Sequence, residues 1–295
     1  MKTVFKKIFH KRTIISLIIV IVLASITGYF GAQFYIDKFM IEVVAVTESE
    51  DRVRDNIDKV LALNAGKTPD QISPKDNFII AEYYLNKETS VKKITQGTVN
   101  ASGITQGLYA EKILSNGEYY SMKISSGLVS LATRLYYIDG EDTVNYYEGT
   151  SIKESSATFP SEPTKVLTQE EYKAMFGSPM TYFVNYVVSS NTVLSEEYIG
   201  KNGSGNYEFK LTLDTAFSVM NYSYEIKTTS GSSKLPKFES IELTFEIDEN
   251  FRLLKTAIKE QYQVSIAQLG NMYMTTNGDL VETFEYNGNF EIPRS

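Results

Sequence analysis

The pattern of apolar and polar residues separates an uncharged N-terminal stretch from a long region of alternating strands. Residues 13–36 carry no charged side chain, and five cationic residues precede them. A helix needs about 20 apolar residues to cross a bilayer, so this stretch is long enough to span one. The cationic residues on its N-terminal side predict a cytoplasmic tail at residues 1–12 and an extracytoplasmic region at residues 37–295.

A cleaved signal peptide is the alternative to a retained anchor. Its apolar region would cover about 7–15 residues and end in a small-residue cleavage site, which this stretch lacks in a clean form. We therefore expect a single-pass signal-anchor in the cell membrane. Ala24, Gly28 and Ala32 share one face of the predicted helix. Small residues at this spacing predict a homodimer through the membrane helix, although ordinary membrane-helix composition also explains them.

Capping residues predict where the later helices begin. A Ser or Thr with Glu three residues later, or with Pro next, is typical of a helix N-terminus, as is a single Asp cap. The helices are expected to begin at Thr47, Ser73, Thr168 and Asp214. The first forms a stalk and linker within residues 37–72. The last carries Phe217 and Tyr224 on one stripe.

From Ile94 onward the apolar period is two, which predicts strands. Asn116-Gly117 is a strong hairpin signal, and Asp139-Gly140 and Asn277-Gly278 predict further turns. Strands are expected at 104–114, 120–124, 131–138, 143–147, 182–188, 193–199, 207–213, 241–247, 254–262, 272–276 and 280–286. The predicted fold is α+β and mostly antiparallel, a curved sheet packed against a few helices. A Ser- and Pro-rich boundary divides it into halves at 73–160 and 161–295.

One hairpin has a register that both of its faces support. Residues 241–247 alternate apolar residues with Glu and Thr, and residues 254–262 alternate them mainly with Lys. Apolar pairs on one face and opposite charges on the other define the register. The predicted opposite pairs are Leu243 and Ile258, Ile247 and Leu254, Glu246 and Lys255, and Glu242 and Lys259.

Composition excludes several kinds of chemistry. The chain carries −7 and its first twelve residues +5, so residues 37–295 carry −12, which disfavours nucleic acid as a partner. The chain has no cysteine or tryptophan, and its single histidine is His10. Residues 37–295 therefore lack Ser-His-Asp and Cys-His catalysis, His or Cys ligands for zinc or haem, and disulfides. We expect no catalytic residue, no cofactor and no metal.

Glu260 breaks the apolar face of its predicted strand, because it shares that face with Ile258 and Tyr262. Burying a lone carboxylate is costly. Glu260 therefore either lies at the rim of the sheet, in water, or points into a cavity and orients a ligand. For the second interpretation the candidate ligand-binding residues are Glu260, Tyr262, Tyr224 and Phe217.

Residues 207–264 resemble the LolA-type lipoprotein-carrier superfamily in the order of their elements. A strand, a helix, a Pro-containing loop and a meander of long amphipathic strands follow one another, with residues 238–248 at the centre of the resemblance. The resemblance implies a curved antiparallel sheet folded around helices. It also implies a concavity, in which many members bind lipid or acyl chains. The N-terminal anchor departs from the free carriers of that superfamily.

Three functions are compatible with these features. We expect a non-enzymatic, membrane-anchored binding or envelope-assembly module that recognises a protein or an envelope polymer through its Tyr-rich strands. The alternative is a module that binds a lipid or other hydrophobic ligand in a cavity between sheet and helices. A third reading is a glycan hydrolase with paired carboxylates from among Glu196, Glu197 and Glu260. An open apolar cavity under the sheet would favour the lipid ligand.

Overall fold

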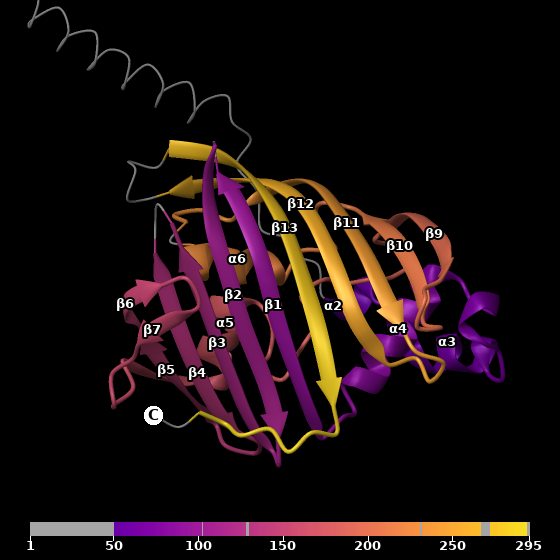
Figure 1. The fold of residues 1–295 in the computed structure, drawn as a ribbon, viewed down its shortest axis with the longest axis horizontal. Coiled ribbons are helices and arrows are strands. Elements are labelled where there is room, and N and C mark those ends of the chain that lie inside the picture. Colours follow the sequence, from indigo (N-terminus) through magenta and orange to yellow (C-terminus); the bar gives the residue numbers. More distant parts are fainter. Residues whose placement is uncertain (1–49, 102, 128–129, 231, 267–271, 294–295) are drawn as a thin grey trace, which may run out of the picture. The chain divides into compact units, whose positions relative to one another are not determined.

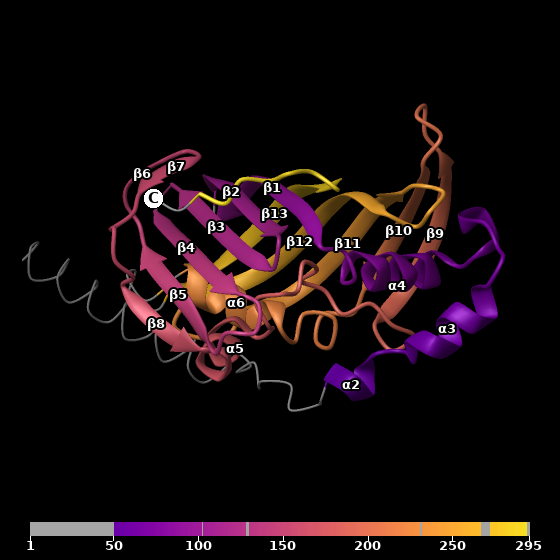
Figure 2. The same cartoon turned by 90° about the horizontal axis from the view of Figure 1, so that it is seen from below.

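A single curved sheet dominates the protein. The computed structural model describes residues 50–293 apart from 102, 128–129, 231 and 267–271. In these residues, strands form one 11-stranded antiparallel sheet in the order β8-β5-β4-β3-β2-β1-β13-β12-β11-β10-β9, and β6 and β7 pair separately. Figures 1 and 2 show the helices gathered on the concave side of the sheet. The predicted α+β fold with a curved antiparallel sheet is therefore confirmed.

The described helices and strands have the following bounds. The helices are α2 Glu50–Val53, α3 Ile57–Asn64, η1 Pro69–Gln71, α4 Pro74–Leu85, α5 Gln169–Phe176 and α6 Tyr222–Ser230. The strands are β1 Ser90–Ala101, β2 Ile104–Ser115, β3 Glu118–Ser126, β4 Leu131–Ile138, β5 Thr143–Glu148, β6 Thr150–Lys153, β7 Ser156–Thr158, β8 Lys165–Thr168, β9 Val193–Lys201, β10 Tyr207–Leu213, β11 Lys237–Ile247, β12 Leu253–Ile266 and β13 Met272–Tyr286.

No helix in the described part of the chain combines the length and the apolar character that a membrane crossing requires. The predicted anchor at 13–36, with its Ala24, Gly28 and Ala32 face, lies outside the described residues.

Both predicted halves contribute to the same sheet. The first strand of the N-terminal half, β1, pairs with the last strand of the chain, β13, from Val91 opposite Tyr286 to Ala101 opposite Thr276. The described residues all belong to one compact unit. Main-chain pairing between β1 and β13 therefore joins the two halves that the expected boundary near residue 160 would separate.

Two predicted helix starts have the expected capping geometry. The Ser73 side chain accepts a hydrogen bond from Asp76 N, and Pro74 occupies the first turn of α4. Thr168 and Glu171 form a reciprocal capping box at the start of α5. Side-chain oxygens here satisfy backbone N–H groups that have no partner inside the helix.

The other two helices differ from the prediction, and the predicted helix start at Thr47 lies outside the described residues. The first is interrupted, because the Asn56 side chain accepts from Lys59 N and starts a new helix, α3, after the short α2. Asp214 does not begin a helix. Its side chain accepts from the N–H groups of Ala216 and Phe217 and closes a turn, and α6 starts only at Tyr222.

One strand prediction and one turn prediction were wrong, and both segments adjoin the candidate site. Residues 182–188 form no strand. They cross the concave face, and the carbonyl groups of Tyr182 and Phe183 accept hydrogen bonds from Lys112 and Lys93 of the sheet. Asn277-Gly278 is not a turn but lies inside the continuous strand β13. A Cβ on Gly278 would lie 2.8 Å from Cγ of Glu260 on the neighbouring strand. Gly278 leaves room for the side chain of Glu260. The Asn-Gly dipeptide alone does not distinguish this role from a turn.

The predicted register of β11 and β12 is confirmed for three of its pairs. Leu243 lies opposite Ile258, Glu246 opposite Lys255 and Glu242 opposite Lys259. The fourth pair is wrong, because a register shift after Glu246 sets Ile247 opposite Leu253 instead of Leu254. A bulge of this kind inserts one residue without changing the faces of the residues before it.

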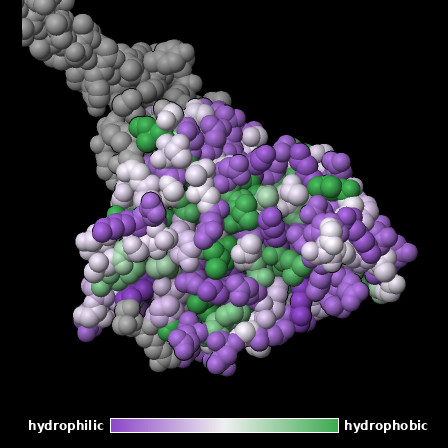
Figure 3. All heavy atoms as spheres, in the orientation of Figure 1, coloured by the Kyte–Doolittle hydropathy of each residue, from purple (hydrophilic) through white to green (hydrophobic). Residues whose placement is uncertain are grey.

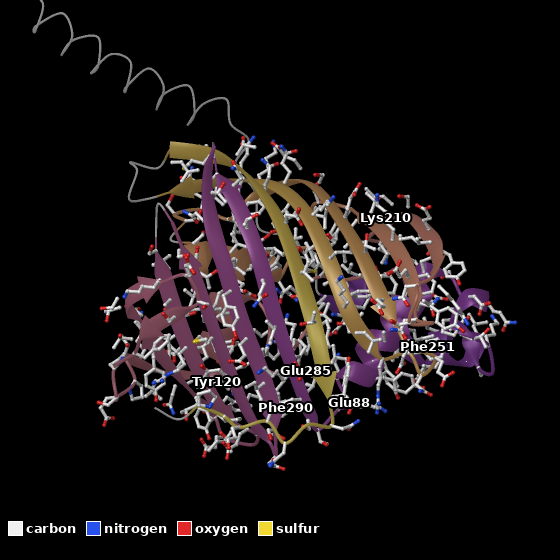
Figure 4. The ribbon with its side chains drawn as sticks, in the orientation of Figure 1. Glu88, Tyr120, Lys210, Phe251, Glu285 and Phe290 are labelled. Carbon is white, nitrogen blue, oxygen red and sulfur yellow. The ribbon has the colours of Figure 1, made fainter. Side chains whose placement is uncertain are left out.

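Polar residues cover much of the outer face, where Lys210 and Glu285 project from β10 and β13 (Figure 4). In the described residues, the buried apolar residues form two main clusters and a small third one of Val53, Val187 and Met220. The larger main cluster lies under β10–β13 and parts of β1 and β2, with α4 and α6, and the smaller lies between β4, β5, β8 and α5. Tyr119 packs against both clusters. The candidate site lies at the seam between them.

Candidate ligand cavity

The floor of the candidate site is the concave face of the central strands. Lys93 of β1 lies directly opposite Lys112 of β2, which in turn lies opposite Ser121 of β3. In the next row Thr95 lies opposite Ala110 on one side and Glu282 on the other. These inward positions are polar or small, whereas their neighbours in both core clusters are large and apolar.

The roof consists of α5, α6 and the segment that follows α5. Gly177 ends α5 with φ 82°, and a Cβ on it would lie 2.1 Å from the carbonyl oxygen of Asn221, just before α6. Only glycine permits this approach. Thr228 Oγ1 also donates to the carbonyl oxygen of Met175 over 2.6 Å. The two helices are thereby joined into one cover over the sheet.

Two adjoining hollows lie between floor and roof. The polar hollow has a volume of about 80 Å³, and the apolar hollow of about 70 Å³. Each has room for several water molecules. The polar hollow is lined by, among others, Lys93, Thr95, Lys112, Ser121, Lys123, Asn185, Glu225 and Glu282. The apolar hollow is lined by, among others, Val99, Leu131, Ile226, Glu260, Tyr262, Val264 and Met274. Both are lined by Leu108, Lys123, Tyr222, Thr229 and Leu280, so we treat them as one seam cavity.

Two lysines of the polar hollow are paired with carboxylates. Lys93 Nζ lies 2.9 Å from Glu282 Oε1, and both side chains are only 8% exposed. Lys93 Nζ also donates to the carbonyl oxygen of Phe183 over 2.6 Å. Lys123 Nζ lies 2.8 Å from Glu225 Oε1. Burial opposes ionisation of Glu225, but the Lys123 ammonium outweighs it and lowers the pKa of Glu225 below its ordinary value.

Lys112 is held differently. Its Nζ donates to the carbonyl oxygen of Tyr182 and lies 5.1 Å from the centre of the Phe183 ring. Burial, reinforced by the nearby ammonium of Lys93, lowers the pKa of Lys112 from 10.5 to about 7. The lowered pKa indicates that the surroundings of Lys112 disfavour a positive charge on this side chain.

Glu260 is buried and hydrogen-bonded, not at a wet rim. It is 4% exposed and accepts from the Tyr186 hydroxyl over 2.5 Å and from the Tyr222 hydroxyl over 3.3 Å. Burial raises the pKa of Glu260 from 4.5 to about 7, against the two hydrogen bonds, which lower it. Its carboxyl group lines the apolar hollow directly opposite Gly278. Because Gly278 has no side chain, β13 leaves space for the Glu260 carboxyl group at this point.

Replacing Glu260 with Gln should change how stability depends on pH. A carboxyl pKa raised in the folded state contributes stability that is present below pH 4.5 and lost as pH rises through about 7. For this shift the loss amounts to about 3 kcal/mol. The E260Q variant stays neutral, so its free energy of unfolding should fall less over that range. Urea denaturation between pH 4.5 and 8 measures the difference, and identical curves for both proteins would contradict it.

The structure brings together two of the four residues predicted to bind a ligand. Glu260 and Tyr262 line the apolar hollow, while Tyr224 is half-buried on α6 outside the lining and Phe217 is 40% exposed in the preceding turn. The charged residues of the polar hollow were missed. Their signal was present, because Lys112 has the parity of the apolar Leu108 and Leu114 in its strand.

The carboxylates proposed for glycan hydrolysis do not meet. Glu196 and Glu197 are exposed on β9, the strand at the sheet edge, and Glu196 accepts from Lys75 N over 2.8 Å. Glu260 faces the seam cavity from β12, and neither hollow is lined by Glu196 or Glu197. Within the described residues, no group of three or more His, Cys, Asp or Glu side chains is placed to hold a metal ion.

Comparisons with known proteins give little further guidance. No protein-family model matches the sequence, and a search of the curated proteins finds no match. Among the solved structures, a DUF1329 family protein from Desulfovibrio piger matches with a TM-score of 0.26 and 11% identity, covering 74% of this chain and 93% of that one. A similarity this weak supports no conclusion on function, so the site is interpreted from its own geometry.

Proposed function

We propose that residues 45–295 form a non-enzymatic binding module whose small-molecule ligand lies in the seam cavity between sheet and helices. The observation that carries the proposal is the cavity itself. Ionisable side chains of the sheet face a hollow of about 80 Å³ at the junction of the two main apolar clusters, where packed apolar residues would be the stable alternative. Groups with strongly shifted pKa values in a cavity are typical of functional sites.

The two ends of the cavity determine what kind of ligand fits. One end presents ammonium, carboxylate, hydroxyl and amide groups, and the other presents mainly aliphatic side chains. Volumes of about 80 and 70 Å³ favour a slim ligand over a bulky one. The cavity is therefore suited to an amphiphilic molecule, in the location that the sequence resemblance to LolA-type carriers implies.

The membrane location belongs to the same proposal and rests on the sequence. The uncharged stretch at 13–36 and the basic residues before it support a single-pass anchor with the binding module on the extracytoplasmic side. A module held at the membrane surface would take up or deliver its ligand close to the bilayer or to an envelope component.

Native mass spectrometry of the full-length chain, released from its own membranes, tests the proposal. We expect a fraction of the protein to retain one small molecule, which solvent extraction then identifies. Protein that is free of any bound molecule, combined with an experimental structure in which side chains fill the cavity, would overturn it.

Surface recognition of a protein or polymer is a second candidate function, supported by the edge strand β9. Leu194 is 68% exposed and Ile199 50% exposed on this strand, which lies at the edge of the sheet. Figure 3 also shows apolar side chains scattered among hydrophilic ones on the outer face of the sheet. An edge strand with exposed apolar residues can pair with another chain. Partner capture that Leu194→Asp abolishes and a filled cavity leaves intact would favour this function.

A further inference from the structure

The polar hollow contains a lysine, Lys112, for which the described residues provide no salt-bridge partner. Like charges directly opposite each other in antiparallel strands repel, and Lys93 and Lys112 form such a pair. Lys93 is compensated by Glu282 at 2.9 Å. Across the described residues, no carboxylate forms a salt bridge with Lys112, and the hydrogen bond of its Nζ goes to the carbonyl oxygen of Tyr182.

The groups around Lys112 are suited to an anion. Ser121 lies directly opposite Lys112 on β3, and Thr133 and Asn185 line the same hollow. Their hydroxyl and amide groups can donate hydrogen bonds to a carboxylate-like head. Three carboxylates line the hollow, Glu111, Glu225 and Glu282, and they are already engaged with Lys92, Lys123 and Lys93. An anion beside Lys112 would relieve the lysine–lysine repulsion and restore the missing counter-charge.

The adjoining hollow gives this anion an apolar extension. Its lining includes Val99, Leu131, Ile226 and Met274, and Leu108 and Leu280 line both hollows. A small anion without a chain would leave the apolar hollow unoccupied. An uncharged apolar molecule would leave Lys112 without an ion-pair partner.

We propose that the seam cavity binds an amphiphile with an anionic headgroup, which Lys112 holds, and with a slim apolar chain, which occupies the apolar hollow. This inference rests on the proposed function and names the ligand class of that same site.

Ten-carbon probes that differ only in their heads test this ligand class. The full-length chain, in an uncharged amphipol, is titrated calorimetrically with decanoate, decanol and decyltrimethylammonium, and with acetate as a head without a chain. Decanoate should bind at least about tenfold more tightly than decanol. Decyltrimethylammonium and acetate should show no binding over the same concentration range.

Lys112→Met separates the headgroup contact from the rest of the cavity. Removing one partner of a buried charge pair should weaken decanoate binding by about 30-fold or more, while decanol binding stays within about threefold. Lys210→Met is the matched control. Lys210 projects from the outer face of β10 (Figure 4) and pairs with Glu242 at 3.0 Å, and neither residue lines a hollow. Its replacement should leave both affinities unchanged.

The remaining outcomes distinguish the ligand class proposed here from the binding function on which it rests. Equal affinities for decanoate and decanol, or a K112M variant that still prefers decanoate, would overturn the anionic headgroup and leave the cavity as a binding site. Acetate binding as tightly as decanoate would overturn the apolar chain. Absence of binding by all four probes would overturn the proposed function itself.

Discussion

Replacing Lys93 with Met should destabilise the protein by about 3–5 kcal/mol, because it leaves the Glu282 carboxylate buried without its cation. Both side chains are 8% exposed, and the Thr95 hydroxyl, 3.3 Å from the same carboxylate oxygen, is a weak substitute. The change also removes the hydrogen bond to the carbonyl oxygen of Phe183, which holds the irregular segment against the sheet. Urea denaturation at pH 7.5 measures the loss.

Two controls distinguish the unpaired charge from the loss of packing. Glu282→Leu added to K93M removes the orphaned carboxylate, so the double variant should recover most of the lost stability. Lys210→Met makes the same change in the exposed pair of Lys210 and Glu242, whose side chains are 36% and 44% exposed. That pair should be worth at most about 1 kcal/mol. A double variant as unstable as K93M alone would contradict this explanation.

Filling the polar hollow should abolish ligand binding while the fold remains. Ala110 lies on the floor of this hollow, in the row between Thr95 and Lys123. A Phe side chain at this position would occupy the space in which a ligand lies. The Ala110→Phe variant should bind decanol and decanoate about 100-fold more weakly than the wild type, by the calorimetric titration described above.

Ala257→Phe is the matched control for this variant. Ala257 lies on β12 between the inward-facing Thr256 and Ile258, so its side chain belongs to the outer face, and it is half-buried. The added ring is the same, but it does not enter the cavity, and binding should be unchanged. Circular dichroism should show both variants folded at the assay temperature. Wild-type affinity in a folded A110F protein would mean that the ligand binds elsewhere.

Much of the architecture follows from local signals in the sequence. Ser73 and Thr168 indicate where α4 and α5 begin, because their side chains accept hydrogen bonds from N–H groups that have no partner at the start of a helix. Alternation in β11 and β12 predicts their pairing, since only one register joins apolar pairs on one face with opposite charges on the other. These features depend on neighbours in sequence or on a single strand partner.

The features that failed depend on contacts across the fold. Asn277-Gly278 has the composition of a turn, but Gly278 is required by Glu260 on the next strand. The segment 182–188 has strand-like residues, but the carbonyl groups of Tyr182 and Phe183 accept hydrogen bonds from Lys112 and Lys93 instead of from a neighbouring strand. Nothing in the local pattern of either segment records those partners.

The candidate site was only partly predictable for the same reason. Glu260 was recognisable because a single carboxylate interrupts an apolar face. The lysines of the polar hollow gain their meaning from cross-strand register, which places Lys93 opposite Lys112 and leaves one of them without a carboxylate. A strand pattern read alone gives the face of each lysine but not its partners.

The most direct test of the account is to locate a bound ligand by photo-crosslinking. A decanol analogue with a diazirine at the end of its chain is bound to the full-length protein, irradiated, and its attachment sites are mapped by peptide mass spectrometry. The account predicts labelling around the apolar hollow, at Val99, Leu131, Ile226 and Met274, and loss of this labelling in A110F. Labelling confined to β9 or the outer face, or equal labelling in A110F, would contradict it.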